Sequence, residues 1–75
     1  MNDRYEMAVE EVDNTLSSIL LESNYLSSSE LFKKGEEAMK DIARKYRITF
    51  EDLSALSEIW LSLKREVLER KFRKE

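Results

Sequence analysis

Apolar side chains recur every three or four residues along most of the chain, which is the spacing of one face of an α-helix. The first apolar row lies near the N-terminus and consists of Tyr5, Val9, Val12, Leu16 and Ile19. Its alternating spacings of four and three residues are typical of a narrow coiled-coil seam. An acidic stripe runs beside the seam at Asp3, Glu6, Glu10 and Asp13. This pattern predicts a helix over residues 3–24.

A second apolar row begins after a serine-rich break at residues 24–29. Ser27 and Glu30 have the spacing of a capping box, in which each side chain accepts from the other residue's backbone amide. We therefore predict a helix over residues 28–46. Its apolar face consists of Leu31, Phe32, Ala38, Met39, Ile42, Ala43 and Tyr46. Gly35 lies near the middle of this face, and since Gly costs a helix about 1 kcal/mol relative to Ala, we expect close approach by a neighbouring helix or a kink there.

The C-terminal third predicts one long helix over residues 49–73, because Thr49 and Asp52 form a weaker cap and the residues after them include no Pro or Gly. One apolar row consists of Leu53, Leu56, Ile59, Trp60, Leu63 and Val67. A second row, roughly 120° around the helix, consists of Phe50, Leu61, Leu68 and Phe72. A helix at the edge of a small bundle buries one apolar face, so we expect another molecule to cover the second row.

These elements predict an all-α fold: a three-helix arrangement in a single domain over residues 1–75, with a long C-terminal helix. At 1.5 Å per residue the third helix is about 38 Å long, so its last turns are expected to project beyond the core. A chain of 75 residues without Cys has no disulfide to stabilise its small core. We therefore expect self-association to supply the missing stability, most simply as a helical homodimer through the third helix.

The composition excludes most catalytic chemistry. The chain has no Cys and no His, so it has no thiol nucleophile, no imidazole base and none of the usual zinc ligands. A single Gly cannot build a phosphate-binding loop. Neighbouring acids such as Glu6 and Glu10 are interpreted as a solvated surface. We predict no enzymatic activity, no cofactor and no metal site.

The predicted localisation depends on segments that the sequence lacks. The longest apolar run is three residues, Ile19 to Leu21, whereas a membrane helix needs about 20. The N-terminus is acidic and has no apolar signal segment. We therefore predict a cytoplasmic protein that does not contact a membrane.

Charge is unevenly distributed although the net charge is only −3. Residues 1–30 contain seven acids and one Arg, and residues 31–50 contain six bases and three acids. The first helix is therefore expected to pair with a basic surface, on its own chain, on a second copy or on another protein. The bases near the C-terminus are Lys64, Arg65, Arg70, Lys71, Arg73 and Lys74. Interleaved acids predict i,i+4 pairs, Glu66 with Arg70 and Glu69 with Arg73, while contact with nucleic acid or an acidic partner stays open.

Residues 41–56 resemble the register of a helix-turn-helix motif. Ala43 is small where two helices approach, Ile48 comes after the turn, and Leu53 and Leu56 are expected to pack inward. Two features depart from the motif: Arg47 stands where Gly is common, and Glu51 and Asp52 open the helix that would face DNA. A small dimeric DNA-binding regulator that uses residues 41–58 and the basic C-terminal tail is therefore the alternative hypothesis.

The favoured prediction is a small non-enzymatic protein–protein interaction module, acting as a regulator, inhibitor or assembly adaptor. It would bind itself and a protein partner through a helical surface. The predicted contact residues are the second apolar row and a basic rim: Phe50, Leu61, Leu68 and Phe72, with Lys64, Arg65 and Lys71. Their expected role is to exclude water and to fix the register of the contact.

Overall fold

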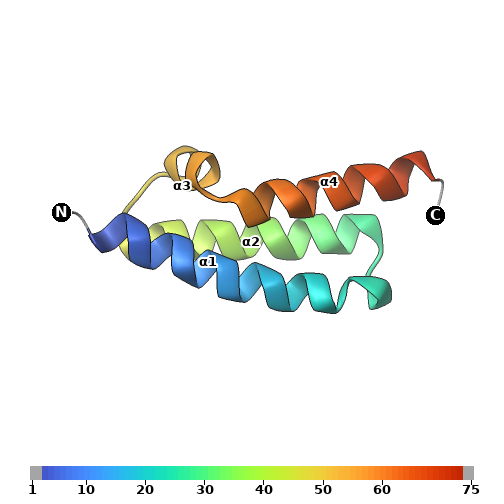
Figure 1. The fold of residues 1–75 in the computed structure, drawn as a ribbon, viewed down its shortest axis with the longest axis horizontal. Coiled ribbons are helices and arrows are strands. Elements are labelled where there is room, and N and C mark those ends of the chain that lie inside the picture. Colours follow the sequence, from blue (N-terminus) through green and yellow to red (C-terminus); the bar gives the residue numbers. More distant parts are fainter. Residues whose placement is uncertain (1–2, 74–75) are drawn as a thin grey trace.

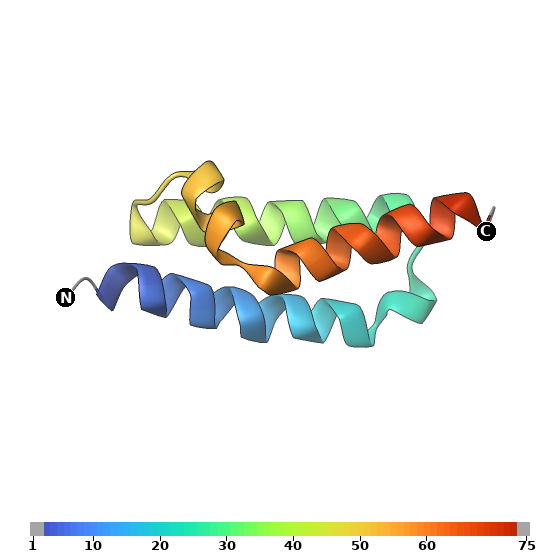
Figure 2. The same cartoon turned by 45° about the horizontal axis from the view of Figure 1, so that its top comes forward.

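The computed structural model describes residues 3–73, in which three long helices run lengthwise and one short helix lies across them (Figure 1). In chain order the elements are α1 (Asp3–Leu21), the 3-10 turn η1 (Ser23–Tyr25), α2 (Ser28–Tyr46), α3 (Phe50–Leu56) and α4 (Glu58–Phe72). The all-α prediction is confirmed for this part of the chain. The molecule measures 44 × 18 × 16 Å, and the last turns of α4 extend past the other helices (Figure 2).

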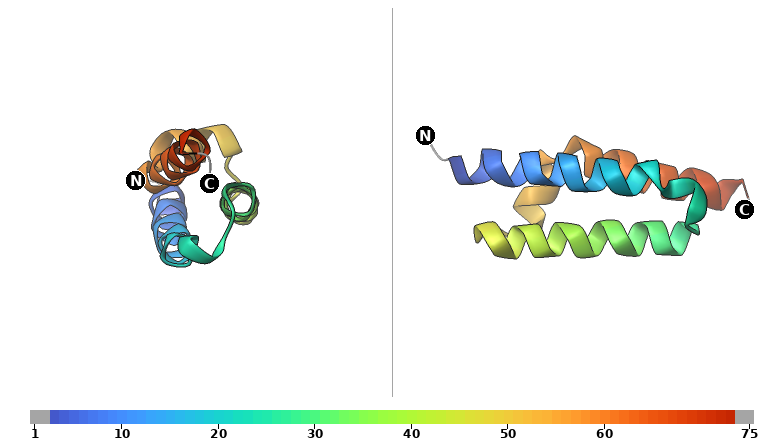
Figure 3. Two further views of the ribbon diagram at one scale, coloured as in Figure 1. Left: turned by 90° about the vertical axis from the view of Figure 1, so that its right-hand side faces the viewer. Right: turned by 90° about the horizontal axis from the view of Figure 1, so that it is seen from below.

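The core lies between α1, α2 and α4, which form the corners of a triangle when viewed end-on (Figure 3, left). The apolar row predicted for the first helix is confirmed at its centre, where Val12 and Leu16 are fully buried. Ala8 is also fully buried, although the predicted seam omits it. The buried apolar residues are Ala8, Val12, Leu16, Leu31, Met39, Ile42, Ala43, Ile48, Leu53, Trp60, Leu63 and Val67.

Local hydrogen bonds fix both ends of α2. The predicted capping box is confirmed: the Glu30 amide donates to Ser27 Oγ at 3.2 Å, and the Ser27 amide donates to Glu30 Oε1 at 3.0 Å. At the other end Arg47 has a φ of 58°, the left-handed conformation that lets the chain reverse. The Ile48 amide then donates to the Ala43 carbonyl at 3.0 Å. The cap at Thr49 is also confirmed, since its Oγ1 accepts from the Asp52 amide at 3.0 Å.

The predicted single helix over residues 49–73 is wrong, because the helix is broken at Ser57. This residue is extended, with φ −101° and ψ 112°, and its hydroxyl accepts from the Trp60 amide at 3.1 Å. Ser57 thereby caps a new helix, α4, and the described residues contain four α-helices instead of three. The break also changes which of two neighbouring side chains is buried. Ser57 is buried, while Leu56, which was expected to pack inward, is 50% exposed.

The first helix also ends earlier than predicted. It stops at Leu21, and residues 23–25 form the separate turn η1. The Leu26 amide donates to the Ser23 carbonyl at 3.1 Å, which tightens the chain just before the α2 cap.

Gly35 allows α2 and α4 to approach closely. It is buried, and a Cβ built on it would lie 2.7 Å from Leu63 Cδ1 and 3.1 Å from Trp60 Cζ3. Real Cβ atoms do not tolerate the first of these distances. The sequence expectation of a close helix approach at Gly35 is therefore confirmed, and α2 is continuous through this position.

Candidate protein-binding surface

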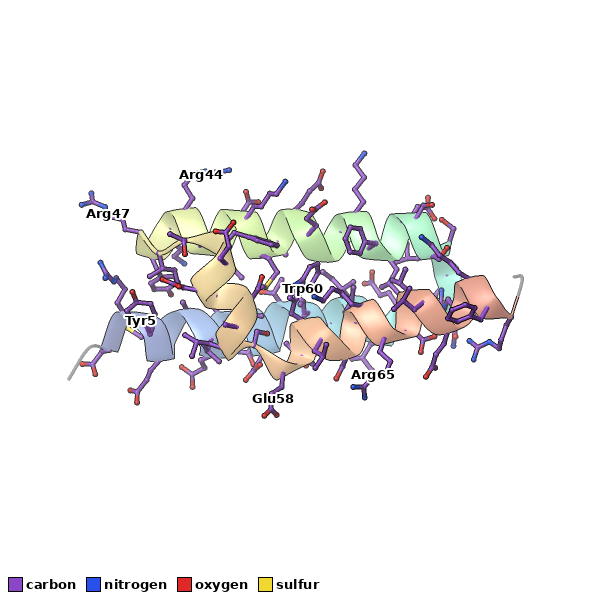
Figure 4. All side chains as sticks on the ribbon, turned by 90° about the horizontal axis from the view of Figure 1, so that it is seen from above. Tyr5, Arg44, Arg47, Glu58, Trp60 and Arg65 are labelled. Atoms are coloured by element: carbon purple, nitrogen blue, oxygen red, sulfur yellow. The ribbon has the colours of Figure 1, made fainter. Side chains whose placement is uncertain are left out.

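An apolar row lies on the outer face of α4. Leu61 and Leu68 are 52% and 53% exposed, and Phe72 is 83% exposed. The opposite face of the same helix carries Trp60 and Leu63, which are buried in the core. Figure 4 shows this division, with Trp60 between the ribbons and Arg65 pointing outward. We refer to Leu61, Leu68 and Phe72 as the outer row.

Phe50 does not lie with the outer row, although the sequence pattern groups them. The break at Ser57 turns α3 away from the axis of α4, so the two helices no longer share a face. Phe50 is half-buried and packs edge-on against Trp60, with 6.0 Å between ring centroids. The Phe32 ring also packs against the Trp60 ring, with 5.7 Å between the ring centroids. Phe50 thus contributes to the core around Trp60, where such aromatic pairs add to the burial of the rings.

A groove beside the outer row separates α4 from the start of α2. It holds about 380 Å³. We call it the basic groove, and its lining residues are Ser28, Ser29, Phe32, Lys64, Val67, Leu68 and Lys71. Lys64 places its ammonium 5.4 Å from the centre of the Trp60 ring, a cation–π distance that keeps the charge at the edge of the groove. Lys71 lies two turns further along α4 and is exposed. Of the predicted rim, Lys64 and Lys71 therefore lie together, and Arg65 lies on the other side of the row.

One base of the C-terminal tail, Arg70, is buried and holds parts of the fold together. Arg70 is only 8% exposed. Its Nη1 donates to the Leu26 carbonyl at 2.7 Å, and its Nε donates to Glu66 Oε2 at 2.9 Å. The predicted Glu66–Arg70 pair is confirmed, whereas the predicted Glu69–Arg73 pair is wrong because Arg73 lies 3.8 Å from Glu66. Lys74 lies outside the described residues.

A second groove lies near the opposite end of the molecule, between α1 and α3. It holds about 470 Å³. We call it the acidic groove, and its lining residues are Tyr5, Glu6, Val9, Glu10, Asp13 and Leu56. The sequence indicates the acidic stripe on α1 but not the groove, because the apolar pattern assigns Leu56 to the core. Apolar side chains from two helices thus form a shallow floor that three carboxylates border.

One acid on α1 forms a polar clamp to α2. Glu11 Oε1 accepts hydrogen bonds from the Tyr46 hydroxyl at 2.7 Å and from Lys45 Nζ at 3.0 Å. The Tyr46 bond and then the Lys45 bond lower the pKa of Glu11 below its ordinary value of 4.5. The same contacts raise the pKa of Lys45 and of Tyr46. One acid of the first helix therefore pairs with a base of its own chain, and these hydrogen bonds link α1 to α2.

Metal-binding clusters and membrane helices are both absent from the described part of the chain. No group of three or more Asp and Glu side chains within residues 3–73 is arranged to hold a metal ion. In the same range, each helix is too short or too polar to cross a lipid bilayer.

Comparison with known proteins adds no further information: no protein-family model, no curated protein and no solved structure matches this chain.

Proposed function

We propose that this protein is a small, non-enzymatic interaction module that binds a partner protein, and further copies of itself, through the outer face of α4. The observation that carries the proposal is the outer row. Leu61, Leu68 and Phe72 present apolar side chains to solvent within three turns of one helix. An exposed apolar row with a charged edge is the usual composition of a surface that another protein covers.

The proposal assigns different roles to the two parts of the predicted site. Leu61 and Leu68 are half-exposed, so a partner can bury the part of each side chain that solvent reaches. Lys64 and Lys71 border this row on the side of the basic groove. The leucines would supply most of the binding energy, while the lysines would select an acidic partner and steer its approach.

A single substitution tests the proposal. Leu68→Asp places a charge at the centre of the outer row, and we expect it to abolish capture of a partner from the native cell lysate. Ser62→Asp is the matched control, because Ser62 is exposed on the same helix but lies outside the row. Mass spectrometry should find a protein that wild type and Ser62→Asp capture and that Leu68→Asp loses. If all three baits capture the same proteins, the outer row is not the binding surface.

The alternative, a DNA-binding regulator, has weaker support. Arg47 adopts the left-handed conformation at which Gly is preferred, so the turn between α2 and α3 has suitable geometry. However, α3 would face the DNA, and its sequence FEDLSAL contains two acids and no base. Lys and Arg supply most of the electrostatic attraction to phosphates, and two carboxylates at the start of α3 would oppose it. We therefore expect no gel shift with mixed-sequence DNA at low salt, and a shift that weakens steeply with added salt would favour the alternative.

A further inference from the structure

Two surfaces of the molecule, one on α4 and one between α1 and α3, combine apolar side chains with charges of opposite sign. The basic face of α4 combines the outer row with Lys64 and Lys71. The acidic groove combines Tyr5, Val9 and Leu56 with three carboxylates. The acids Glu6 and Asp13 are exposed and line this groove. Each surface thus has the apolar area and the charge that would complement the other.

The charges on the two surfaces also have the same spacing. Lys64 and Lys71 are seven residues apart on α4, and Glu6 and Asp13 are seven residues apart on α1. Seven residues correspond to about 10.5 Å along a helix axis. When α4 of one copy lies along α1 of another, both lysines can therefore face a carboxylate at the same time. Leu68, which lies between the two lysines in the sequence, would then face the apolar floor.

The two surfaces lie toward opposite ends of the molecule. The acidic groove involves the first turns of α1, while the basic groove involves the start of α2 and the second half of α4 (Figures 1 and 4). The long axis of the molecule is 44 Å. One chain therefore cannot place its own basic face in its own acidic groove, and a contact between unlike ends leaves one surface free on each outer copy.

We propose that copies of this chain associate head to tail, with the basic face of α4 from one copy seated in the acidic groove of the next. The inference rests on the proposed function, because it names a second copy as the occupant of the same outer row. A symmetric antiparallel pair of α4 helices is less favourable. It would bring Lys64 and Lys71 of one copy against the same lysines of the other, which places like charges together.

Complementary variants test this arrangement by light scattering at low ionic strength. Leu68→Asp disables the basic face and leaves the acidic groove intact. The double variant Glu6→Lys/Asp13→Lys reverses the charge at two of the acidic positions that line the acidic groove, and it leaves α4 intact. Alone, each variant should have the mass of one chain. Mixed in equal amounts, they should form a complex of two chains and no larger species, because only one productive contact is available.

Wild type should show a mass that rises with concentration beyond two chains. The control Glu22→Lys/Glu37→Lys changes the net charge equally at exposed positions outside both grooves, and it should assemble like wild type. Circular dichroism should give all variants the helix content of wild type. Assembly of Glu6→Lys/Asp13→Lys alone, a wild-type mass that stops at two chains, or a mixture that stays monomeric would each overturn the inference.

The result separates this inference from the proposed function. A wild type that is monomeric at every concentration, but loses a captured partner on Leu68→Asp, supports the binding module and rejects head-to-tail assembly. Assembly as described, without any captured partner that depends on Leu68, supports self-recognition and rejects a foreign partner for this surface.

Discussion

Gly35 is the residue at which local helix propensity and packing oppose each other most directly. Alanine there would favour the helix by about 1 kcal/mol, but its methyl group would meet Leu63 Cδ1 at 2.7 Å. Leu63 is fully buried and has little room to move, and overpacking costs about 1–3 kcal/mol. We expect Gly35→Ala to lower the free energy of unfolding by about 1 kcal/mol in chemical denaturation.

A double-mutant cycle provides the control for this prediction. Leu63→Ala removes the two closest of the three atoms that the new methyl group would meet and leaves Trp60 Cζ3 at 3.1 Å. Gly35→Ala should therefore destabilise the Leu63→Ala protein less than it destabilises wild type. An equal loss of stability in both backgrounds would contradict the packing explanation.

Glu11 is expected to link stability to pH. Its pKa is lower in the folded protein because Tyr46 and Lys45 donate to its carboxylate. The resulting stability is present above the ordinary pKa of 4.5 and is lost as the pH falls through the folded value. Urea unfolding should therefore show a larger loss of stability between neutral and acid pH for wild type than for Glu11→Gln. Equal losses in the two proteins would show that the clamp does not contribute.

The same clamp predicts the behaviour at alkaline pH. The pKa values of Lys45 and Tyr46 are raised by their hydrogen bonds to Glu11. A raised pKa gives stability below the ordinary value, 10.5 for Lys45 and 10.0 for Tyr46, which is lost as the pH rises further. The contribution of the clamp should thus be greatest between the acid and alkaline ranges.

Individual residues differ in how far the sequence reveals their roles. Caps such as Ser27 with Glu30 depend on neighbours three positions away, so the sequence predicts them correctly. The burial of Arg70 depends on the carbonyl of Leu26, far away in the chain. Nothing in the local spacing indicates that contact, so the sequence alone suggests a surface base at Arg70.

At the scale of elements, Ser57 decides how the last third of the chain folds. Its hydroxyl accepts from the Trp60 amide in a buried position. Losing an N-cap typically costs about 0.5–2 kcal/mol, so we expect Ser57→Ala to destabilise the protein by about 1–2 kcal/mol in thermal or chemical unfolding. Ser57→Thr keeps the acceptor and should retain more stability, while Ser62→Ala, on the exposed side of α4, should change little.

The break itself was not predictable from apolar periodicity. Leu53, Trp60 and Leu63 keep the spacing of one continuous helix on both sides of Ser57, so the pattern does not register the interruption. The only local signal is a serine placed three residues before Trp60, and serines are also found inside helices. The outer row could be predicted because all three members lie on α4, whereas Phe50 was misplaced because it lies across the break.

At the scale of the whole molecule, the apolar pattern predicts the all-helical class, and the structure is a thin one. The shortest dimensions are 18 and 16 Å, so almost every helix has one face in water. The two grooves could not be predicted, because each is formed by helices that are distant in the sequence. The acidic groove needs Leu56 of α3 beside Val9 of α1, and the basic groove needs Phe32 of α2 beside Leu68 of α4.

The extended backbone at Ser57 has a consequence for the acidic groove. One wall of that groove is α1, which packs along the length of α2, and the other wall is Leu56 at the end of α3. Only the two torsion angles of Ser57 separate this leucine from the first residue of α4. Because Ser57 is buried and its hydroxyl accepts from the Trp60 amide, and because Leu53 of α3 is fully buried, the extended backbone at Ser57 fixes the end of α3 against the core. One small polar residue thereby sets where Leu56 stands opposite α1, and with it the shape of the acidic groove.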